Sequence, residues 1–277
     1  MRNILTKYTT RAGLCAMALV LAAALVLAGC KQEAEPSRQE TQLEKDIKAL
    51  AGKGAGIHEV KADKTLTNAD IEHIKEALQS LPATVKVNLN LSSATEITSI
   101  GLLAFSNCTA LASVSIPASV KSIESNAFSG CTSLTSFTIP ESVTTISQQT
   151  FWNCSNLTEV SLPNTMNTIE SFAFENCTKL TTVSTYGTKT DPGGKGISSY
   201  AFYGCSALKS VTIPESVTSI ESYAFSNCSA LDSVTFKNTT GWKIYNDTQP
   251  ITVTTPSENA TKLKKGGDWY STNLTKS

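Results

Sequence analysis

The chain has 277 residues, and its 23 lysines and arginines balance 23 aspartates and glutamates, so its formal net charge is zero. A chain without net charge has no overall field that would attract nucleic acid or an anionic membrane. Its three arginines, Arg2, Arg11 and Arg38, lie near the start, and no basic stripe follows them in the sequence. The composition therefore argues against a nucleic-acid-binding protein.

The first thirty residues read as an export signal. Arg2, Lys7 and Arg11 supply a positive start, and an uncharged apolar run follows over residues 12–29. That run is long enough to span a bilayer as an uncleaved helix. However, it ends in LAGC, and small residues directly before Cys30 favour cleavage. Residues 1–29 are therefore predicted to be a signal peptide.

The LAGC tetrapeptide resembles the lipobox of bacterial lipoproteins, whose cysteine is lipidated and becomes the new N-terminus. The resemblance implies a diacylglycerol and acyl lipid on Cys30, the only cofactor-like group that we expect. Several acyl chains hold a protein durably on a membrane, whereas one holds it only marginally. Residues 31–41 are polar and alternately charged, so residues 30–56 are predicted to be the lipidated cysteine and a polar tether.

Six further cysteines divide the middle of the chain into units. They are Cys108, Cys131, Cys154, Cys177, Cys205 and Cys228. Their spacings are 23, 23, 23, 28 and 23 residues, a period that indicates stacked structural repeats. Ile stands eight residues before each cysteine, Phe three before, Leu three after, and Val or Phe six after.

This register predicts the layout of one repeat. The pattern L-x-x-V-x-I alternates apolar and polar residues, which is typical of a short strand with one buried face. The A-F-x-x-C segment is predicted to form about one helical turn on the opposite side. One unit of 23 residues cannot bury its apolar residues alone, so we expect stacked units with paired parallel strands. Four prolines are predicted to end the strands: Pro117, Pro140, Pro163 and Pro214.

The repeat cysteines are predicted to be buried free thiols. Disulfides are the alternative, because an exported chain meets an oxidising compartment. All six cysteines point the same way into the core, however, and this direction suits disulfide geometry poorly. A buried free cysteine acts as a small hydrophobic residue.

The motif L-x-x-V-x-[IL]-P-x-x-[VM]-x-x-I-x-x-x-A-F-x-x-C, over residues 100–236, resembles the treponemal-type, BspA-like class of leucine-rich repeat. The resemblance implies an α/β fold, a right-handed solenoid with a parallel β-sheet on the concave face and short helical turns opposite. It also implies a non-catalytic surface protein, since several members are adhesins. Two departures are Thr150 in place of Ala, and a fourth repeat with Thr185 in the strand, no proline and five extra residues.

Both ends of the repeat array are predicted to be capped, because an open solenoid exposes its core and a sheet edge. Residues 57–99 are the predicted N-terminal helical cap, with Thr67 as N-cap, Asp70 at the capping-box position, and a strand over residues 85–91 that starts the sheet. The apolar stripe of this helix is Ile71, Ile74, Leu78 and Leu81.

Residues 237–277 are the predicted C-terminal β cap. The segments GWKIYND and ITVTTP read as a strand pair joined by a polar turn. The residues expected to cover the last repeat are Trp242, Ile244, Ile251 and Val253, with Trp269 and Tyr270 as possible additions. An independent binding module is the alternative reading of this segment.

The sequence offers no catalytic or metal-binding constellation. The two histidines, His58 and His73, precede the repeats and are predicted to be solvated. Glu124, Glu170 and Glu221 share one register in alternate repeats, about 10 Å apart or more at the rise per strand, which is too far for a paired-carboxylate mechanism. We therefore expect no enzyme activity and no bound metal.

Three surfaces are candidates for binding. Outward strand positions form a ladder in which eleven of twelve residues carry a hydroxyl: Ser113, Ser115, Ser136, Thr138, Glu159, Ser161, Thr182, Ser184, Ser210, Thr212, Ser233 and Thr235. These residues either solvate the sheet or bind a partner. Aromatic residues on the opposite side either form an exposed patch or shield the turns: Trp152, Phe172, Tyr200, Tyr203 and Tyr223. The insertion at 186–196 is the third candidate.

These observations predict a lipid-anchored, non-catalytic protein on the outer surface of a bacterial cell envelope. Its expected partner is a macromolecule, most simply a host or bacterial protein, with the membrane contacted through the lipid. The adhesin role comes from the family resemblance, because a fold does not fix a function. Two rivals remain at this stage: a periplasm-facing scaffold lipoprotein, and an enzyme acting on envelope polymers.

Overall fold

The computed structural model describes residues 39–184, 196–213, 217, 219–237, 242–244, 256–264 and 269–271. The chain divides into a unit of residues 1–40 and a compact unit of residues 41–277. The predicted signal peptide, Cys30, the first part of the tether and the insertion up to residue 195 lie outside the described residues.

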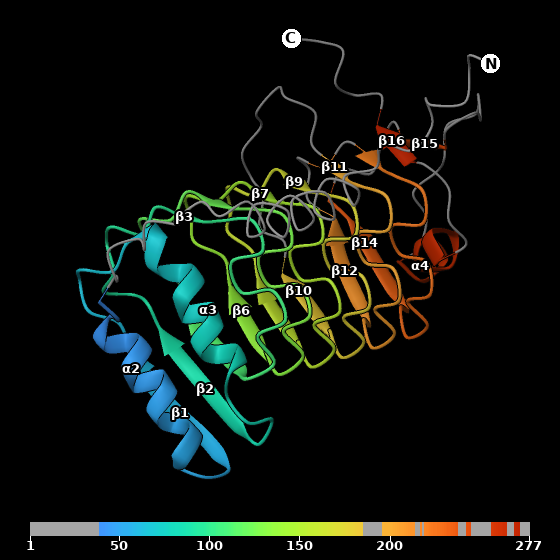
Figure 1. Cartoon of the computed structure of the whole chain (residues 1–277). Helices are drawn as coiled ribbons and strands as arrows, with labels where there is room; N and C mark the ends of the chain where they lie inside the picture. The colour runs from blue at the N-terminus through green and yellow to red at the C-terminus, as the bar shows by residue number, and fades with distance from the viewer. Residues whose placement is uncertain are drawn as a thin grey trace, which may run out of the picture. The chain divides into compact units, whose positions relative to one another are not determined.

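Each repeat contributes one main strand, and the last five of these strands pair into one parallel sheet (Figure 1). The strands are β4 (Leu111–Ser115), β6 (Ser136–Thr138), β8 (Glu159–Ser161), β10 (Thr182–Ser184), β12 (Ser210–Ile213) and β14 (Ser233–Phe236). Strands β6 to β14 form one five-stranded sheet in which Val160 lies opposite Phe137 and Val183. These three central residues are buried, and the strand neighbours Ser136, Thr138, Glu159 and Thr182 are exposed, so the predicted alternation is confirmed.

A second set of parallel strands carries the isoleucine of each repeat. These strands are β3 (Ser99–Ile100), β5 (Ser122–Ile123), β7 (Thr145–Ile146), β9 (Thr168–Ile169), β11 (Gly196–Ile197) and β13 (Ser219–Ile220). Each spans two residues, with the serine, threonine or glycine exposed or half-buried and the isoleucine buried. The isoleucine register therefore has a second function beyond filling the core, because it also aligns a second ladder of backbone hydrogen bonds.

The core between the two sheets is a continuous column of phenylalanine rings. Consecutive rings stack with centroids 5.1–5.6 Å apart and planes within 10° of parallel. All are at most 1% exposed: Phe105, Phe128, Phe151, Phe174, Phe202 and Phe225. Phe137 packs edge-on against two of the rings. The prediction that stacking hides residues that no single repeat can bury is confirmed.

The six repeat cysteines are buried free thiols, as predicted. Five of them donate to the carbonyl of the phenylalanine in the preceding repeat, at Sγ–O distances of 3.0–3.1 Å; an example is Cys154 to Phe128. The first thiol, Cys108, has no preceding repeat and lies 3.9 Å from the Lys75 carbonyl of the N-terminal cap. The thiol is thus both a small apolar filler and a weak donor that links adjacent repeats.

The predicted short turns lie opposite the main sheet, and they are hydrogen-bonded turns with no α-helix. In every repeat the residues five and one before the cysteine have φ between 57° and 72°, which interrupts any helix. The position just before the cysteine is Asn or Gly throughout, the residues that tolerate this left-handed conformation best. Along the turns, backbone N–H groups donate to the next repeat, as from Phe128 to Thr150 and from Gly130 to Trp152.

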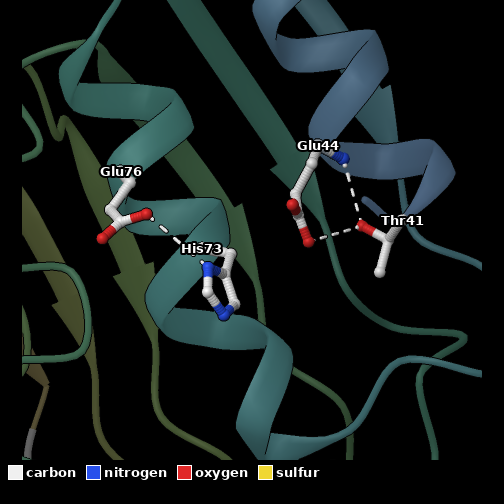
Figure 2. A network of polar contacts seen from close by, with 4 residues as sticks. All are labelled: Thr41, Glu44, His73 and Glu76. Atoms are coloured by element: carbon white, nitrogen blue, oxygen red, sulfur yellow. Dashed lines mark hydrogen bonds and ion pairs between the residues drawn. The ribbon is translucent and has the colours of Figure 1, made fainter. Parts of the chain in front are cut away.

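The N-terminal cap begins earlier than predicted. Its elements are α2 (Gln42–Ala49), η1 (Leu50–Gly52), β1 (Gly56–Lys61), η2 (Asn68–Asp70), α3 (Ile71–Gln79) and β2 (Val85–Asn90). Helix α2 lies within residues 30–56, the predicted tether, and buries Leu43 and Ile47, so that boundary is wrong. Figure 2 shows Thr41, the N-cap residue of α2, whose hydroxyl accepts from the Glu44 amide, with α3 beside this helix. Leu43 and Ile47 are one helical turn apart, which is why this polar segment folds onto the cap.

The predicted cap helix is present as η2 and α3. The Asp70 carboxylate accepts from the Thr67 amide and hydroxyl at 2.8 Å, and the four residues of the predicted apolar stripe are buried. Strand β2 pairs with β4 as expected, but it does not start the sheet, because β1 pairs in parallel on its other side. The sheet therefore starts one strand earlier than predicted.

The C-terminal cap combines strands with a helix that was not predicted. Strand β15 (Trp242–Ile244) pairs with β16 (Trp269–Ser271), and β16 pairs with β13, both antiparallel. The predicted partner of β15, the ITVTTP segment, lies largely outside the described residues. Helix α4 (Pro256–Lys264) packs against β14 and buries Ala260 and Leu263.

Side-chain amides satisfy backbone groups at both ends of the repeats. At the first repeat, the Gln79 amide donates to the Ser106 carbonyl at 2.7 Å, in the place that a preceding repeat's N–H would take. At the last repeat, the Asn259 amide donates to the Val234 carbonyl at 3.2 Å, on the open edge of β14. Each cap thus supplies hydrogen bonds as well as apolar cover.

Candidate functional site

The outward positions of the main strands form a continuous polar surface, which we call the strand face. Parallel pairing brings Ser136 opposite Glu159 and Thr212 opposite Thr235, so side chains of neighbouring repeats stand in rows. Apart from Ser184, whose side chain lies outside the described part, each predicted ladder residue is exposed or half-buried. The rows therefore lie where they were predicted, and their role in binding stays a prediction.

The strand face continues into the N-terminal cap, which the sequence did not indicate. Ser113 donates to the Asn88 side chain at 2.8 Å, and Asn88 donates to Glu59 at 2.5 Å. These residues come from β4, β2 and β1, which are adjacent strands of one sheet. A partner that lies across the repeats meets the same kind of hydrogen-bonding surface on the cap.

The main sheet is interrupted between β4 and β6. Strand β4 belongs to a three-stranded sheet with β1 and β2, and its pairing with β2 contains a register shift. Beside the interruption lies a shallow hollow of about 440 Å³. Its lining includes the ladder residues Ser115 and Thr138, and also Ile116, Pro140, Glu141 and Ser142. The hollow gives this otherwise regular face one distinct feature.

The predicted aromatic residues come together on the turn side. Phe172, Tyr200 and Tyr223 stack in sequence, with centroids 5.1 and 5.2 Å apart. Tyr203 lies 5.5 Å from Tyr200 and tilts 58° to it. Tyr223 is 47% exposed, and the other predicted aromatics, including Trp152, are half-buried. The patch is therefore partly exposed and partly self-packed, so each of the two predicted alternatives describes part of it.

The glutamates of the shared register have a structural role that was not predicted. Glu124 accepts from the Leu102 amide, and Glu170 accepts from the Gln148 amide, at 3.0 and 2.9 Å. Glu221 accepts from both the amide and the hydroxyl of Ser199. Each carboxylate therefore links its repeat to the preceding one. Carboxylates spread over alternate repeats in this way do not form an acid–base pair.

The remaining titratable groups of the described chain also lack a catalytic arrangement. His73 lies 3.5 Å from Glu76 on the exposed side of α3, while His58 contacts the Gly54 carbonyl (Figure 2 shows the first pair). Burial raises the pKa of the Cys154 thiol to about 12, so this buried sulfur is a protonated, poor nucleophile at neutral pH. Among the residues that the structure describes, no three His, Cys, Asp or Glu side chains gather as a metal site.

Within the described ranges, no helix combines the length and the apolar character needed to cross a membrane.

Comparison with known proteins identifies the class of this fold. A family model described as BspA type leucine-rich repeat region (6 copies) matches residues 86–194 and 195–267, well over half of the chain. The chain therefore belongs to the BspA type leucine-rich-repeat family, and the predicted family and solenoid fold are confirmed.

Several solved structures are similar to the chain. A leucine-rich repeat protein of T. pallidum is 27% identical, with a TM-score of 0.46, and the alignment covers 62% of this chain and 77% of that one. Leucine-rich repeat proteins of Eubacterium ventriosum and Bacteroides ovatus are 19% and 22% identical, with TM-scores of 0.43 and 0.42. These two alignments cover 70% and 65% of this chain, and 63% and 55% of the two solved chains. With TM-scores below 0.5, these likenesses add no argument to the family match.

No curated protein matches the chain. Members of the BspA-like family are bacterial and are typically surface-exposed or secreted. Leucine-rich repeats of this kind are generally non-enzymatic scaffolds, and they generally mediate protein binding. The chain accordingly belongs to a class of repeat proteins that are generally non-enzymatic.

Proposed function

We propose that the chain is a lipid-anchored adhesin of a bacterial cell surface that binds protein through the strand face and has no catalytic activity. The anchor is Cys30, supported by the LAGC sequence after an apolar run. The binding role is supported by membership of a family whose repeats generally mediate protein binding.

One observation carries the choice of surface: hydroxyl-bearing side chains stand in register on neighbouring strands of one sheet. Small hydroxyl side chains both donate and accept hydrogen bonds, and they lose little conformational entropy when a partner covers them. The hollow beside Thr138 adds a place for an apolar side chain of the partner, because Ile116 and Pro140 line it. A flat polar face with one apolar recess suits recognition of a folded protein surface.

The binding site is tested with charged substitutions on two matched strands. In the strand-face variant, Ser136→Glu and Thr138→Glu place two carboxylates on exposed positions of β6; in the control, Ser122→Glu places one on an exposed position of β5. Full-length protein is measured against immobilised extracellular-matrix and envelope proteins. The proposal expects binding to fall at least tenfold in the strand-face variant only. Equal binding by both variants would exclude the strand face.

The anchor and the location have separate tests. Metabolic labelling with a fatty acid is expected to label the wild-type chain and to leave Cys30→Ala unlabelled. Protease treatment of intact cells is expected to remove the repeats. Repeats that survive this treatment, but are degraded after the outer membrane is opened, would replace the adhesin with a periplasm-facing scaffold.

A further inference from the structure

The turn side of repeats three to six presents a second surface, distinct from the strand face, which we call the turn face. It consists of the aromatic stack Phe172, Tyr200 and Tyr223 and of a parallel column two residues before the cysteines, formed by Trp152, Glu175 and Tyr203. The two columns touch through the Tyr200–Tyr203 ring pair. Backbone hydrogen bonds from Asn153 to Glu175 and from Asn176 to Tyr203 keep the second column in register.

The backbone of the stack is unfavourable for the residues that occupy it. Phe172, Tyr200 and Tyr223 have φ of 61°, 61° and 60°. The same position in repeats two and three is held by Asn126 and Gln149 at φ of 58° and 57°. A left-handed conformation costs a side chain with a Cβ about 1–2 kcal/mol, and an aromatic pair returns about 0.5–1.5 kcal/mol. Folding alone gives little reason to prefer aromatic residues at this position.

The charge of the turn segments is one-sided. The nine residues from isoleucine to cysteine in each of the six repeats, all described, contain no lysine, arginine or histidine. They contain four glutamates, of which Glu170 and Glu175 belong to the repeat of Phe172, and Glu221 belongs to that of Tyr223. The lysines of the repeats lie elsewhere, for example Lys209 beside β12. Within these segments the charged residues are therefore all negative; from the C-terminal cap, Lys264 lies beside the last segment, where its carbonyl accepts from the Ser226 hydroxyl.

Hydrogen bonds hold these carboxylates in place but do not neutralise their negative charge. Glu170 accepts from the Gln148 amide, and Glu221 accepts from the Ser199 amide and hydroxyl. Glu175 stands between Trp152 and Tyr203 in its column. Partial burial raises the pKa of Glu175, and a side-chain hydrogen bond with Trp152 acts in the opposite direction. A carboxylate set between two aromatic rings is arranged to receive a cation with a long apolar stem.

We propose that the turn face of repeats three to six binds an arginine- or lysine-bearing segment of a partner polypeptide. The apolar stem of the basic side chain packs on the rings of Tyr203 and Trp152, and its charged end pairs with Glu175. A second basic side chain packs against Tyr223 and reaches Glu221. Arginine is the better ligand, because its planar guanidinium pairs with a carboxylate through two hydrogen bonds and stacks on aromatic rings.

The test uses full-length protein in nonionic detergent and fluorescein-labelled octa-arginine, with octa-glutamate as the charge-reversed probe. Fluorescence anisotropy gives the Kd. The wild type is expected to bind octa-arginine at least tenfold more tightly than octa-glutamate. The Tyr200→Asn/Tyr223→Asn variant is expected to lose at least tenfold in affinity while it stays folded, because asparagine tolerates φ near 60°.

Two single substitutions separate a built site from general attraction. Glu175→Gln removes the charge inside the turn face, whereas Glu96→Gln removes one charge at an exposed position of the N-terminal cap. The proposal expects a loss of about fivefold or more for Glu175→Gln and no change for Glu96→Gln. Equal losses in these two variants, unchanged affinity in the double asparagine variant, or no preference for octa-arginine in the wild type would each overturn it. None of these results bears on the strand face.

Discussion

The strand side and the turn side of the same six repeats follow different rules. On the strand side, extended backbone places every second residue outward, and any small polar residue fits there. On the turn side, two residues of each repeat have a left-handed conformation, and the segment packs the phenylalanine and cysteine columns beneath it. The strand side therefore shows uniform chemistry in every repeat, whereas the turn side differs from repeat to repeat, with its aromatic residues in repeats three to six.

This difference separates stability from recognition. Residues that point between the sheets have the same identity in almost every repeat because each contacts its equivalents above and below. Residues that point outward contact no such stack unless, like Phe172 and Tyr200, they form one of their own. Substitutions that compare the two directions at neighbouring positions can break or sharpen this account.

The largest effect is expected from the core column. Phe151→Ala removes a ring that stacks on Phe128 and Phe174 and packs edge-on against Phe137, so it leaves a cavity in the middle of the core. Large-to-small substitutions of buried phenylalanine cost about 3–5 kcal/mol. Urea unfolding of Phe151→Ala and of the adjacent control Trp152→Ala measures the contrast. A free energy of unfolding that changes equally in both variants would contradict the core column.

The next effect concerns the left-handed position before the cysteine. Gly130 has φ of 70°, and an added Cβ would lie 2.3 Å from the Asn107 side-chain oxygen. Gly130→Ala is therefore expected to cost at least about 1–2 kcal/mol. Gly52→Ala is the control, because nothing lies within 4 Å of a Cβ there. Thermal unfolding that lowers the midpoint of both variants equally would show that the turn geometry does not constrain this position.

A smaller, pH-dependent effect is expected from the thiols. Burial raises the pKa of Cys154 from 9.0 to about 12. Between these two pH values the Cys154 thiol stays protonated in the folded state but loses its proton in the unfolded chain. The contribution of this thiol to the free energy of unfolding is therefore complete below pH 9 and is lost between about pH 9 and 12, at about 1.4 kcal/mol per pH unit. Cys154→Ala is expected to flatten the slope of unfolding free energy against pH by that amount above pH 9, and an unchanged slope would refute the buried thiol.

Much of the repeat architecture could be predicted, because the physical signal was repeated six times. A single Phe in a loop does not predict how its ring packs, but Phe at the same register in every repeat predicts that the rings stack. The second set of strands could not be predicted in this way. Strands such as β9 have two residues, which is too short for an alternating pattern to appear, and their pairing depends on the register that the core imposes.

The elements of the two caps that were not predicted were missed for a similar reason. Helix α4 buries little beyond Ala260 and Leu263, so its apolar signal is weak. Helix α2 did carry a readable signal, since Leu43, Ile47 and Leu50 follow helical spacing, but the polar stretch before it suggested a continuous tether. Capping by Gln79 was not predictable, because it depends on which carbonyl the first repeat leaves open.

The candidate surfaces were only partly predictable. Alternation identified the outward strand residues, but the hollow beside Thr138 depends on the interrupted pairing of β4 and β6, a backbone event without a sequence pattern. The stacking of Tyr200 on its neighbours was expected as a patch. Its left-handed backbone was not, because tyrosine rarely adopts positive φ.

The shared core is tested most directly with the six repeat thiols, because each reports on its own repeat. Full-length protein is pulsed with a thiol-alkylating reagent over a urea series, and the label on each cysteine is measured by peptide mass spectrometry. The account predicts that all six are protected in the native state and become reactive together as the phenylalanine column separates. A repeat cysteine that reacts in native protein as fast as in unfolded chain would contradict a continuous core.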